Sequence, residues 1–323
     1  MLHLQISILY LQHNCINKNS IMKQNHFEVI IIGGSYSGLS AAMSLGRSLR
    51  QVLIIDSGLP CNRQTPHSHN FITQDGETPA TITAKAKKQV AMYKTIQFYN
   101  GLATGIEKTD KGFEIATKSG QVFTAKKVLF ATGVKDLLPE IDGFASCWGI
   151  SILHCPYCHG YEVKNEKTAI IANGDMGFEY AKLISNWTKD LKLCTNGKST
   201  LTLEQTQILN KHQVEIIENE IDFFEHENGS IKHIIFKNGE KTAVKAIYHR
   251  PAFEQHCPLP EVMGCELNEQ GLLKTDAFQR TTVPGIYASG DNHNPARSVA
   301  MAVYTGSFAG AIINREIIEE DFI

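Results

Sequence analysis

Residues 27–38 read FEVIIIGGSYSG, an apolar and β-branched run that stops at a glycine-rich turn. A helical pattern follows over residues 39–49, and a second apolar run over residues 51–55 ends in Asp56. This order predicts a strand, a tight turn, a helix and a second strand that ends in an acid. It is the order of a dinucleotide-binding unit, and the distance from turn to acid is close to the roughly 20 residues expected.

Each part of this turn has a physical role in holding a nucleotide. The three glycines at Gly33, Gly34 and Gly38 allow a tight turn and a close approach of the backbone. Ser35 stands where the motif has its middle glycine, and its small side chain still lets a phosphate come close. The helix N-terminus holds the pyrophosphate, and Asp56 accepts hydrogen bonds from ribose hydroxyls.

A second turn of the same kind begins after a predicted strand over residues 168–171. Residues 172–177 read ANGDMG, a helix follows to about residue 187, and the next strand over 191–195 ends at Asn196. Gly174 and Gly177 are retained, but Ala172 replaces the first glycine, no acid closes the next strand, and no arginine cluster follows to bind a 2′-phosphate. We therefore leave two interpretations open, a nicotinamide nucleotide site and a turn with a structural role only.

The last third of the chain contains another strand that delivers an acid into a glycine turn, Gly290-Asp291. Ser298 and Val299 then open a helix with small residues at 300, 302, 306, 309 and 310. Small side chains on one helix face permit close packing or contact with a flat cofactor, and we expect both. Strands that alternate with helices predict an α/β fold.

Residues 154–162 read HCPYCHGYE and indicate thiol chemistry. Cys155 and Cys158 can close into a disulfide across one helical turn, and a helix N-terminus stabilises the thiolate that attacks other disulfides. His159 is the general acid or base candidate, because its ordinary pKa suits proton exchange with thiols. Glu162, one turn on, is expected to orient or charge His159.

A zinc site is a different interpretation of the same segment, since His154, Cys155, Cys158 and His159 are all of zinc-ligand type. A structural zinc site normally takes its second pair of ligands from a distant segment. The remaining candidates, at positions 256, 257 and 265, lack a matching spacing. We therefore expect no metal.

Composition narrows the class of protein. A chain of 323 residues predicts two domains, and its net charge of −2 gives no reason to expect nucleic acid or an anionic membrane as partner. No apolar run approaches the ~20 residues of a membrane span. Eight cysteines are too few for a disulfide framework, so the six outside the redox pair are expected to be buried hydrophobes in a cytoplasmic protein: Cys15, Cys61, Cys147, Cys194, Cys257 and Cys265. We interpret residues 1–21 as an unstructured extension ahead of a start at Met22.

Taken together, the motifs resemble the thioredoxin reductase family of two-domain flavoproteins, over the whole chain from Phe27 onward. The matching segments, in the family's order, are residues 33–38, the strand end at 131–133, the cysteine pair and residues 288–291. The resemblance implies two Rossmann-like, three-layer ββα dinucleotide-binding domains, the second inserted in the first. The FAD-binding domain would comprise residues 22–143 and 247–323, and residues 144–246 would form the NAD(P)-binding-like domain that carries the redox pair.

The resemblance also implies roles for individual residues. Gly33, Gly34, Ser35, Gly38 and Asp56 would bind the adenosine half of FAD, and Gly290 and Asp291 its ribityl or pyrophosphate region. Backbone N–H groups around Ser298 and Val299 would face the flavin ring, Gly133 ends a strand beside it, and Asn70 looks like the flavin-side asparagine. Cys158 would lie against the flavin, and Cys155 would be the outward interchange thiol. Gly174 and Gly177 would hold NADPH, and the family is mostly homodimeric.

Two departures from the family bear on the direction of electron flow. His159 stands where relatives have an acid, and residues 194–196 replace a histidine-arginine-arginine segment. The sequence around the cysteines is similar to that of a branch of the family that includes the gliotoxin-type dithiol oxidases. The favoured function is a reductase that passes electrons from NAD(P)H through FAD to a thioredoxin-like protein or a small-molecule disulfide. The alternative is a dithiol oxidase that returns electrons to dioxygen. A flavin-bearing redox sensor without turnover is a third possibility.

Overall fold

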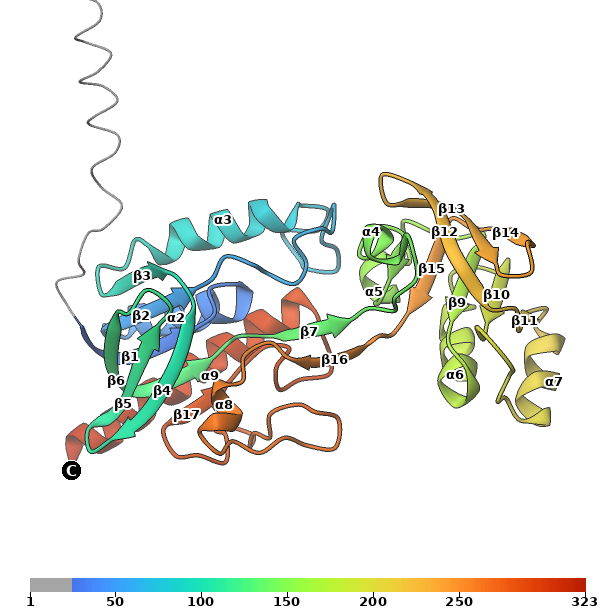
Figure 1. Cartoon of the computed structure of the whole chain (residues 1–323). Helices are drawn as coiled ribbons and strands as arrows, with labels where there is room; N and C mark the ends of the chain where they lie inside the picture. The colour runs from blue at the N-terminus through green and yellow to red at the C-terminus, as the bar shows by residue number, and fades with distance from the viewer. Residues whose placement is uncertain (1–24) are drawn as a thin grey trace, which may run out of the picture.

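The computed structural model describes residues 25–323, and the expected extension over residues 1–21 lies outside this range. The first predicted unit forms strand β1 (His26–Ile32), helix α2 (Tyr36–Arg47) and strand β2 (Val52–Asp56). The helix begins three residues earlier than the pattern indicated, with Ser35 in extended conformation at its N-cap position and no side-chain hydrogen bond capping it. The strand–turn–helix–strand order is confirmed (Figure 1).

The larger sheet has the order β3-β2-β1-β6-β5-β4. In addition, β17 pairs with residues 128–130 at the end of β6. Its further strands are β3 (Ile96–Asn100), β4 (Ala103–Thr109), β5 (Gly112–Thr117), β6 (Val122–Phe130) and β17 (Ile286–Ala288). Strands β3, β2, β1, β6 and β17 run parallel, and β4 and β5 are antiparallel.

Alternating residues of β1 separate two cores in this unit. Val29 and Ile31 pack with α2 and with α9 (Val299–Phe322), whereas Ile30 and Ile32 pack with side chains of β5 and β6. Helix α3 (Pro79–Val90) also covers the helical side (Figure 1). Helices, parallel sheet and antiparallel strands thus make three layers, which confirms the expected ββα arrangement.

The smaller sheet repeats this plan with the parallel order β11-β10-β9-β15-β8. Its strands are β8 (Ile152–Leu153), β9 (Thr168–Ile171), β10 (Leu191–Cys194), β11 (Glu215–Ile217) and β15 (Ala246–His249). Helices α6 (Gly174–Ile184) and α7 (Leu203–Lys211) lie over one core, and the strands β12 (Ile221–Glu227), β13 (Ser230–Phe236) and β14 (Lys241–Ala243) lie over the other. Because the larger sheet takes strands from both ends of the chain, this unit is inserted in it.

Two strands connect the units, β7 (Val134–Leu137) on the way out and β16 (Ala252–Gln255) on the way back, paired antiparallel (Figure 1). Three further helices are short: α4 (Phe144–Cys147), α5 (Pro156–His159) and α8 (Leu259–Val262). The domain limits at residues 143/144 and 246/247 stay a prediction. Defined by its sheet alone, the inserted unit would extend to His249, because β15 pairs with both β9 and β8.

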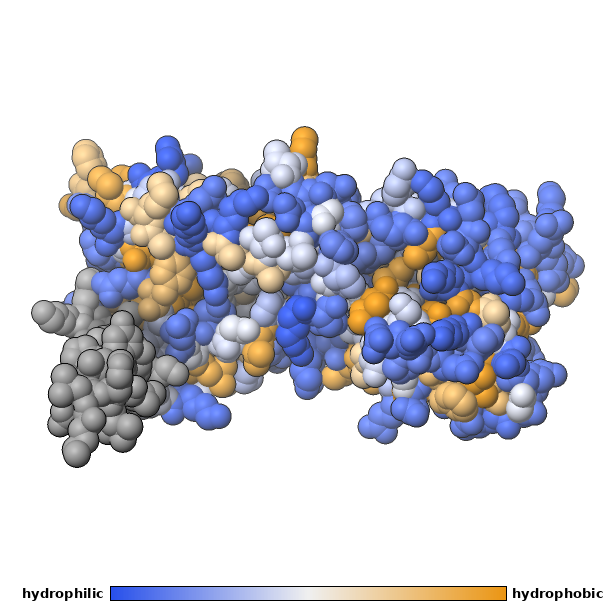
Figure 2. Space-filling model, turned by 90° about the horizontal axis from the view of Figure 1, so that it is seen from above, coloured by the Kyte–Doolittle hydropathy of each residue, from blue (hydrophilic) through white to orange (hydrophobic). Residues whose placement is uncertain are grey.

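No helix among residues 25–323 combines the length and apolarity that a bilayer crossing requires. The face of the molecule seen in Figure 2 is mostly hydrophilic, and its hydrophobic residues are gathered in separate patches.

Candidate functional site

A cavity of about 580 Å³ lies between the two units and collects most of the predicted site residues. This volume is in the range of small-molecule and cofactor sites. The cavity is lined by the first glycine turn, the loop after β2, the end of β6, the start of α9 and the redox segment. From the predicted set it includes Gly33, Gly34, Ser35, Asp56, Gly133, Gly290, Asp291, Ser298, Val299, Cys155, Cys158 and His159.

The first turn has the geometry of a nucleotide cradle. Gly33 has φ +110°, which favours glycine, and a Cβ on Gly34 would lie only 2.8 Å from the side chain of Asp56. Helix α2 begins with no side-chain cap and no acid in its first turn, so its N–H groups are free to bind an anion. Gly38 brings the helix against the turn, as its Cβ would clash with the Gly33 carbonyl oxygen.

Asp56 ends β2 as predicted, and it already has partners in the protein. Lys87 Nζ lies 3.0 Å from Oδ2, and the Gly58 N–H donates to Oδ1 at 3.2 Å. A carboxylate has about four acceptor sites, so Asp56 keeps capacity for ribose hydroxyls. The ion pair to Lys87 is a contact that the sequence analysis did not anticipate.

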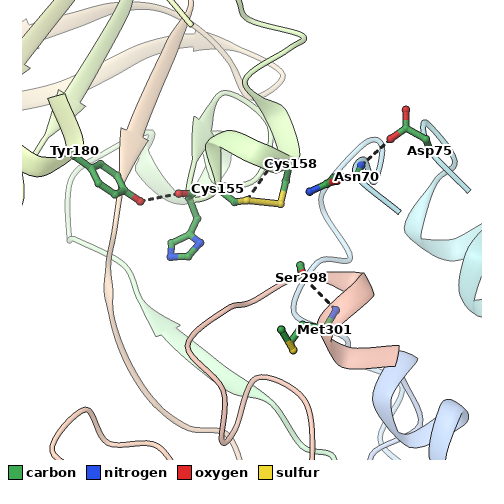
Figure 3. Close-up of a disulfide and its surroundings, with 8 residues drawn as sticks. Asn70, Asp75, Cys155, Cys158, Tyr180, Ser298 and Met301 are labelled. Carbon is green, nitrogen blue, oxygen red and sulfur yellow. Dashed lines mark hydrogen bonds between the residues drawn. A yellow bond between two sulfur atoms is a disulfide. The ribbon is translucent and has the colours of Figure 1, made fainter. Parts of the chain in front are cut away.

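The opposite wall of the cavity is built by the start of α9. Ser298 caps this helix, and its Oγ accepts a hydrogen bond from Met301 N at 3.1 Å (Figure 3). Gly290 has φ +84° and its N–H donates to Thr305 Oγ1. Burial raises the pKa of Asp291, and Arg297 opposes that rise. Glycine backbone and a helix N-terminus thus line this wall of the cavity, as they line the first turn.

The small-residue face of α9 serves packing and the cavity at once, as expected. A Cβ on Gly306 or Gly310 would meet the backbone of α2, and Ser40 Oγ donates to the Val303 carbonyl at 2.7 Å. Ala302 lines the cavity. Close approach of the two helices thus brings the start of α2 against the second turn of α9, and the N-termini of both helices line the cavity.

Cys155 and Cys158 are joined by a disulfide, with their Cα atoms 5.3 Å apart (Figure 3). Cys155 is the N-cap of α5, and its Sγ accepts a hydrogen bond from the Cys158 N–H at 3.2 Å. Pro156 at the first helical position suits this short helix. An N–H aimed at Cys155 Sγ would stabilise a thiolate there once the disulfide is reduced.

His159 lies at the cavity and has a second histidine beside it. The ring of His69, from the loop after β2, stands edge-on at 6.4 Å between centroids. Burial lowers the pKa of His159, a positive charge on His69 would lower it further, and Glu162 opposes both effects. His159 is therefore neutral at neutral pH and can accept a proton.

The expected effect of the Glu162 charge on His159 is present, whereas the described ion pair of Glu162 is with another histidine. Glu162 Oε1 lies 3.6 Å from Nε2 of His69, and among the described ion pairs its partner is His69. The helix ends at Gly160, so residue 162 is not one regular turn beyond His159 but points toward the loop of the other unit. Its effect on His159 is through its charge alone.

The loop over residues 67–76 approaches the disulfide from the larger unit. Asn70 has φ +60°, and its N–H donates to Asp75 Oδ1 at 2.7 Å (Figure 3). His67, Ser68 and His69 line the cavity, whereas Asn70 is not among its lining residues. The flavin-side role of Asn70 stays a prediction.

The second glycine turn differs from the first in its surroundings. Gly174 has φ +56°, and its missing Cβ would lie 2.8 Å from Thr200 Oγ1 of the same chain. Asn173 Oδ1 accepts from the N–H groups of Gly174 and Thr200, both at 2.8 Å. Asp175 places an acid in the first turn of α6. The position that a pyrophosphate takes in such a turn is thus lined by a hydroxyl, an amide and a carboxylate.

Gly177 has a packing role in this turn. Its Cβ would lie 3.2 Å from the Ala172 carbonyl oxygen and 3.2 Å from Leu193 Cδ1. This is the close helix–strand contact for which the third glycine of the motif is needed. Neither Gly174 nor Gly177 reaches the cavity that contains the cysteine pair.

The cysteines outside the redox pair are buried at four positions, as expected: Cys147, Cys194, Cys257 and Cys265. Cys61 contradicts the prediction, because it is exposed to the cavity from the loop after β2. The surrounding protein walls, which disfavour a charged sulfur, and the charge of Asp291 raise the pKa of Cys61 to about 11, so it is a thiol and not a thiolate at neutral pH. Cys15 lies outside the described residues. Within residues 25–323, no group of three or more His, Cys, Asp or Glu side chains is arranged to hold a metal ion.

Two site residues were missed by the sequence analysis, Asp136 and Arg297. Arg297 donates to both carboxylate oxygens of Asp136, at 2.7 and 3.1 Å, and its Nε lies 3.5 Å from Asp291. Both side chains line the cavity. An arginine next to the predicted Ser298 was the only signal, since its partner is 161 positions away in the chain.

Comparisons with known proteins agree with this geometry. A model of the pyridine nucleotide-disulphide oxidoreductase family matches residues 27–306. The chain is 29% identical over 307 residues to thioredoxin reductase tcpT of Claviceps purpurea, covering 92% of this chain and 96% of that protein. It is 30% identical over 295 residues to thioredoxin reductase aclD of Aspergillus oryzae, covering 88% and 94%. The structure of an oxidoreductase from Agrobacterium tumefaciens is 36% identical with a TM-score of 0.85, covering 91% of this chain and 99% of that one.

Proposed function

Because the chain belongs to the pyridine nucleotide-disulphide oxidoreductase family, we propose that it is a FAD-dependent enzyme that exchanges electrons between Cys155–Cys158 and a substrate dithiol or disulfide. One observation carries this proposal: the disulfide and the glycine cradle line the same cavity. The flavin would supply a second two-electron carrier, which links the cysteine pair to a further electron donor or acceptor.

In this proposal the first turn and the start of α9 hold FAD. Gly33, Gly34, Ser35 and Gly38 receive the pyrophosphate at the uncapped N-terminus of α2, and Asp56 accepts from the ribose. A second set forms the flavin end of the cavity: Gly133, Gly290, Asp291, Ser298 and Val299. Beside that end, the positive charge of Arg297 balances part of the negative charge of the Asp291 carboxylate.

The thiol chemistry assigns different roles to the two cysteines. Cys155 is the interchange thiol, because the Cys158 N–H is aimed at its sulfur and would stabilise the thiolate. Cys158 is the flavin-side thiol. His159 is neutral in the resting protein, so it takes the proton of an incoming thiol and returns it to the leaving cysteine.

The second turn favours oxidation of a dithiol with dioxygen as the final electron acceptor. Thr200 approaches Gly174 from the side where a pyrophosphate would lie, and Asp175 repels an anion at the start of α6. The first turn has neither obstacle. The contrast between two turns of one chain argues against NADPH as a tightly bound electron donor.

The reductase direction is the second candidate function. It uses NAD(P)H at Gly174 and Gly177 and a thioredoxin-like protein or a small-molecule disulfide as acceptor. Its support is the retained second Rossmann-like unit and the names of the two fungal relatives. A homodimeric state accompanies either candidate as a prediction.

Anaerobic mixing separates the two directions. We expect dithiothreitol to bleach the flavin absorbance of the wild-type holoenzyme quickly, and NADPH and NADH to do so far more slowly. Cys155→Ser and Cys158→Ser should both abolish bleaching by the dithiol. Cys265→Ser is the matched control, because the serine hydroxyl can keep the contact to Thr281 Oγ1. Rapid bleaching by NADPH followed by turnover with thioredoxin would overturn the oxidase direction in favour of the reductase.

A further inference from the structure

The loop over residues 67–76 places a histidine between two carboxylates next to α5, the helix that carries Cys158 and His159. His69 Nδ1 lies 3.7 Å from Asp75 Oδ1 in its own loop, and Nε2 lies 3.6 Å from Glu162 Oε1 in the other unit. Figure 3 shows Asn70 and Asp75 of this loop on the side of the disulfide where Cys158 lies. Both ring nitrogens of His69 thus face an acid, one from each unit.

The exposed fraction of the side chain increases from His69 to Glu162 and from Glu162 to Asp75. The His69 side chain is 19% exposed, that of Glu162 40% and that of Asp75 67%. The ring of His159 is the inner neighbour of His69 and the ring of His67 is its outer neighbour, each at 6.4 Å between centroids. His67 is held by its Nδ1 contact to the Gly76 carbonyl at 2.9 Å. The titratable groups that face His69 are therefore His67, Asp75, His159 and Glu162.

We propose that His69 is a positioning residue of the thiol–disulfide step: it sets the protonation of His159 and relays protons between His159 and solvent through Glu162 and Asp75. This rests on the proposed function of Cys155 and Cys158. A charge on His69 disfavours a charge on His159, and Glu162 favours it. A proton that reaches His159 is thus passed outward to a histidine that has two carboxylates to stabilise it.

The exchange step moves protons between thiols in either direction. A substrate dithiol first attacks one cysteine sulfur, which breaks the Cys155–Cys158 bond and forms a mixed disulfide. The second substrate thiol then attacks that bond and releases the second cysteine. The substrate loses two electrons and two protons and becomes a disulfide, and the cysteine pair gains both and becomes a dithiol. Each attacking thiol must lose a proton before its attack, and each leaving cysteine must gain one.

The test compares the pKa of His159 in two variants, measured by NMR with labelled histidine, alongside the pH dependence of anaerobic exchange with dithiothreitol. His69→Gln replaces a side chain that can carry a positive charge by one that cannot, so the pKa of His159 should rise and the acid limb of the rate should move to higher pH. Glu162→Gln removes a negative charge, so both should move to lower pH. We also expect His69→Gln to slow exchange about tenfold at neutral pH. Added imidazole should restore part of that loss.

Gln74→Ala is the control for the loop, because Gln74 lies in it and bonds to Lys85 away from the cavity. It should leave the pKa of His159 and the rate profile unchanged. An equal loss of rate at all pH values in His69→Gln, without a shift of the His159 pKa and without rescue by imidazole, would overturn the proposal. If the wild-type protein showed no exchange with the dithiol at all, the proposed function itself would fail, and the two failures are thus distinct.

Discussion

Asp136 and Arg297 form a bidentate ion pair that joins the strand leaving the larger unit to the start of the last helix. Asp136 lies on β7, one of the two strands that connect the units, and Arg297 precedes α9. Their side chains are 12% and 15% exposed, so the pair is largely shielded from water. This pair fixes the crossing strand against the wall of the cavity.

Asp136→Asn should lower the thermal stability of the protein and weaken FAD retention. The change leaves Arg297 with Asp291 at 3.5 Å as its remaining carboxylate. Removal of one partner from a buried pair costs about 3 kcal/mol. Lys135→Ala is the control, because Lys135 pairs with Glu254 at the exposed surface and should cost less than about 1 kcal/mol. Equal melting temperatures of the two variants would contradict a structural role for the buried pair.

Gly34→Ala should release FAD, because the new Cβ would meet the Asp56 side chain at 2.8 Å and displace the ribose acceptor. Gly105→Ala is the matched control in the same unit, since its Cβ would lie at an ordinary 3.4 Å from Ala116 Cβ. The flavin content of the purified variants, read from the ratio of visible to ultraviolet absorbance, measures the effect. Full flavin content in Gly34→Ala would show that the first turn does not hold the cofactor.

NADPH should not raise the melting temperature of the wild-type holoenzyme at about 1 mM, because a ligand stabilises only when it binds the folded state above its dissociation constant. The physical reason is the contact of Thr200 with Gly174 and the acid at Asp175. Asn173→Ala should itself cost about 1 kcal/mol, as it removes the cap of α6 and the anchor of Thr200. A saturable NADPH shift in the wild type would support the reductase direction.

Acid should destabilise the protein through two buried histidines. Burial lowers the pKa of both His154 and His293 to about 4, and for His154 the charge of Arg297 contributes. In the unfolded chain both titrate near the ordinary value of about 6.5, so the unfolded state binds more protons between these limits. Stability is therefore complete above about pH 6.5 and falls as the pH drops toward 4. His293→Phe should make this fall in melting temperature shallower, and an unchanged slope would contradict the assignment.

Cys155 should be alkylated by iodoacetamide faster than Cys158 in the reduced protein near neutral pH. The Cys158 N–H stabilises the thiolate of Cys155, and no described hydrogen bond does so for Cys158 Sγ. Mass spectrometry of the alkylated peptide measures the order. Faster labelling of Cys158 would indicate that Cys158 is the interchange thiol and Cys155 the flavin-side thiol.

The local order of residues in the sequence determined the secondary structure around both glycine turns and the position of the disulfide. The apolar runs with their glycine turns predicted both Rossmann-like units, because a buried parallel strand and a tight turn to a helix have strong local signatures. The pair at positions 155 and 158 predicted a disulfide, because three residues of separation place two thiols on one helical turn. Ala172 and the missing acid at Asn196 marked the second turn as different.

Only the tertiary structure decided which groups meet. His69 and Glu162 come from different units, Asp136 and Arg297 lie 161 positions apart, and Thr200 returns to Gly174 from a later loop. Such contacts depend on how strands and loops pack after the chain has crossed between the units, and no local periodicity encodes them. For the same reason the sequence did not reveal the contact of Glu162 with His69, and it counted Cys61 among the buried hydrophobes. Burial and the partner charges, which set the protonation of His159, arise from that packing alone.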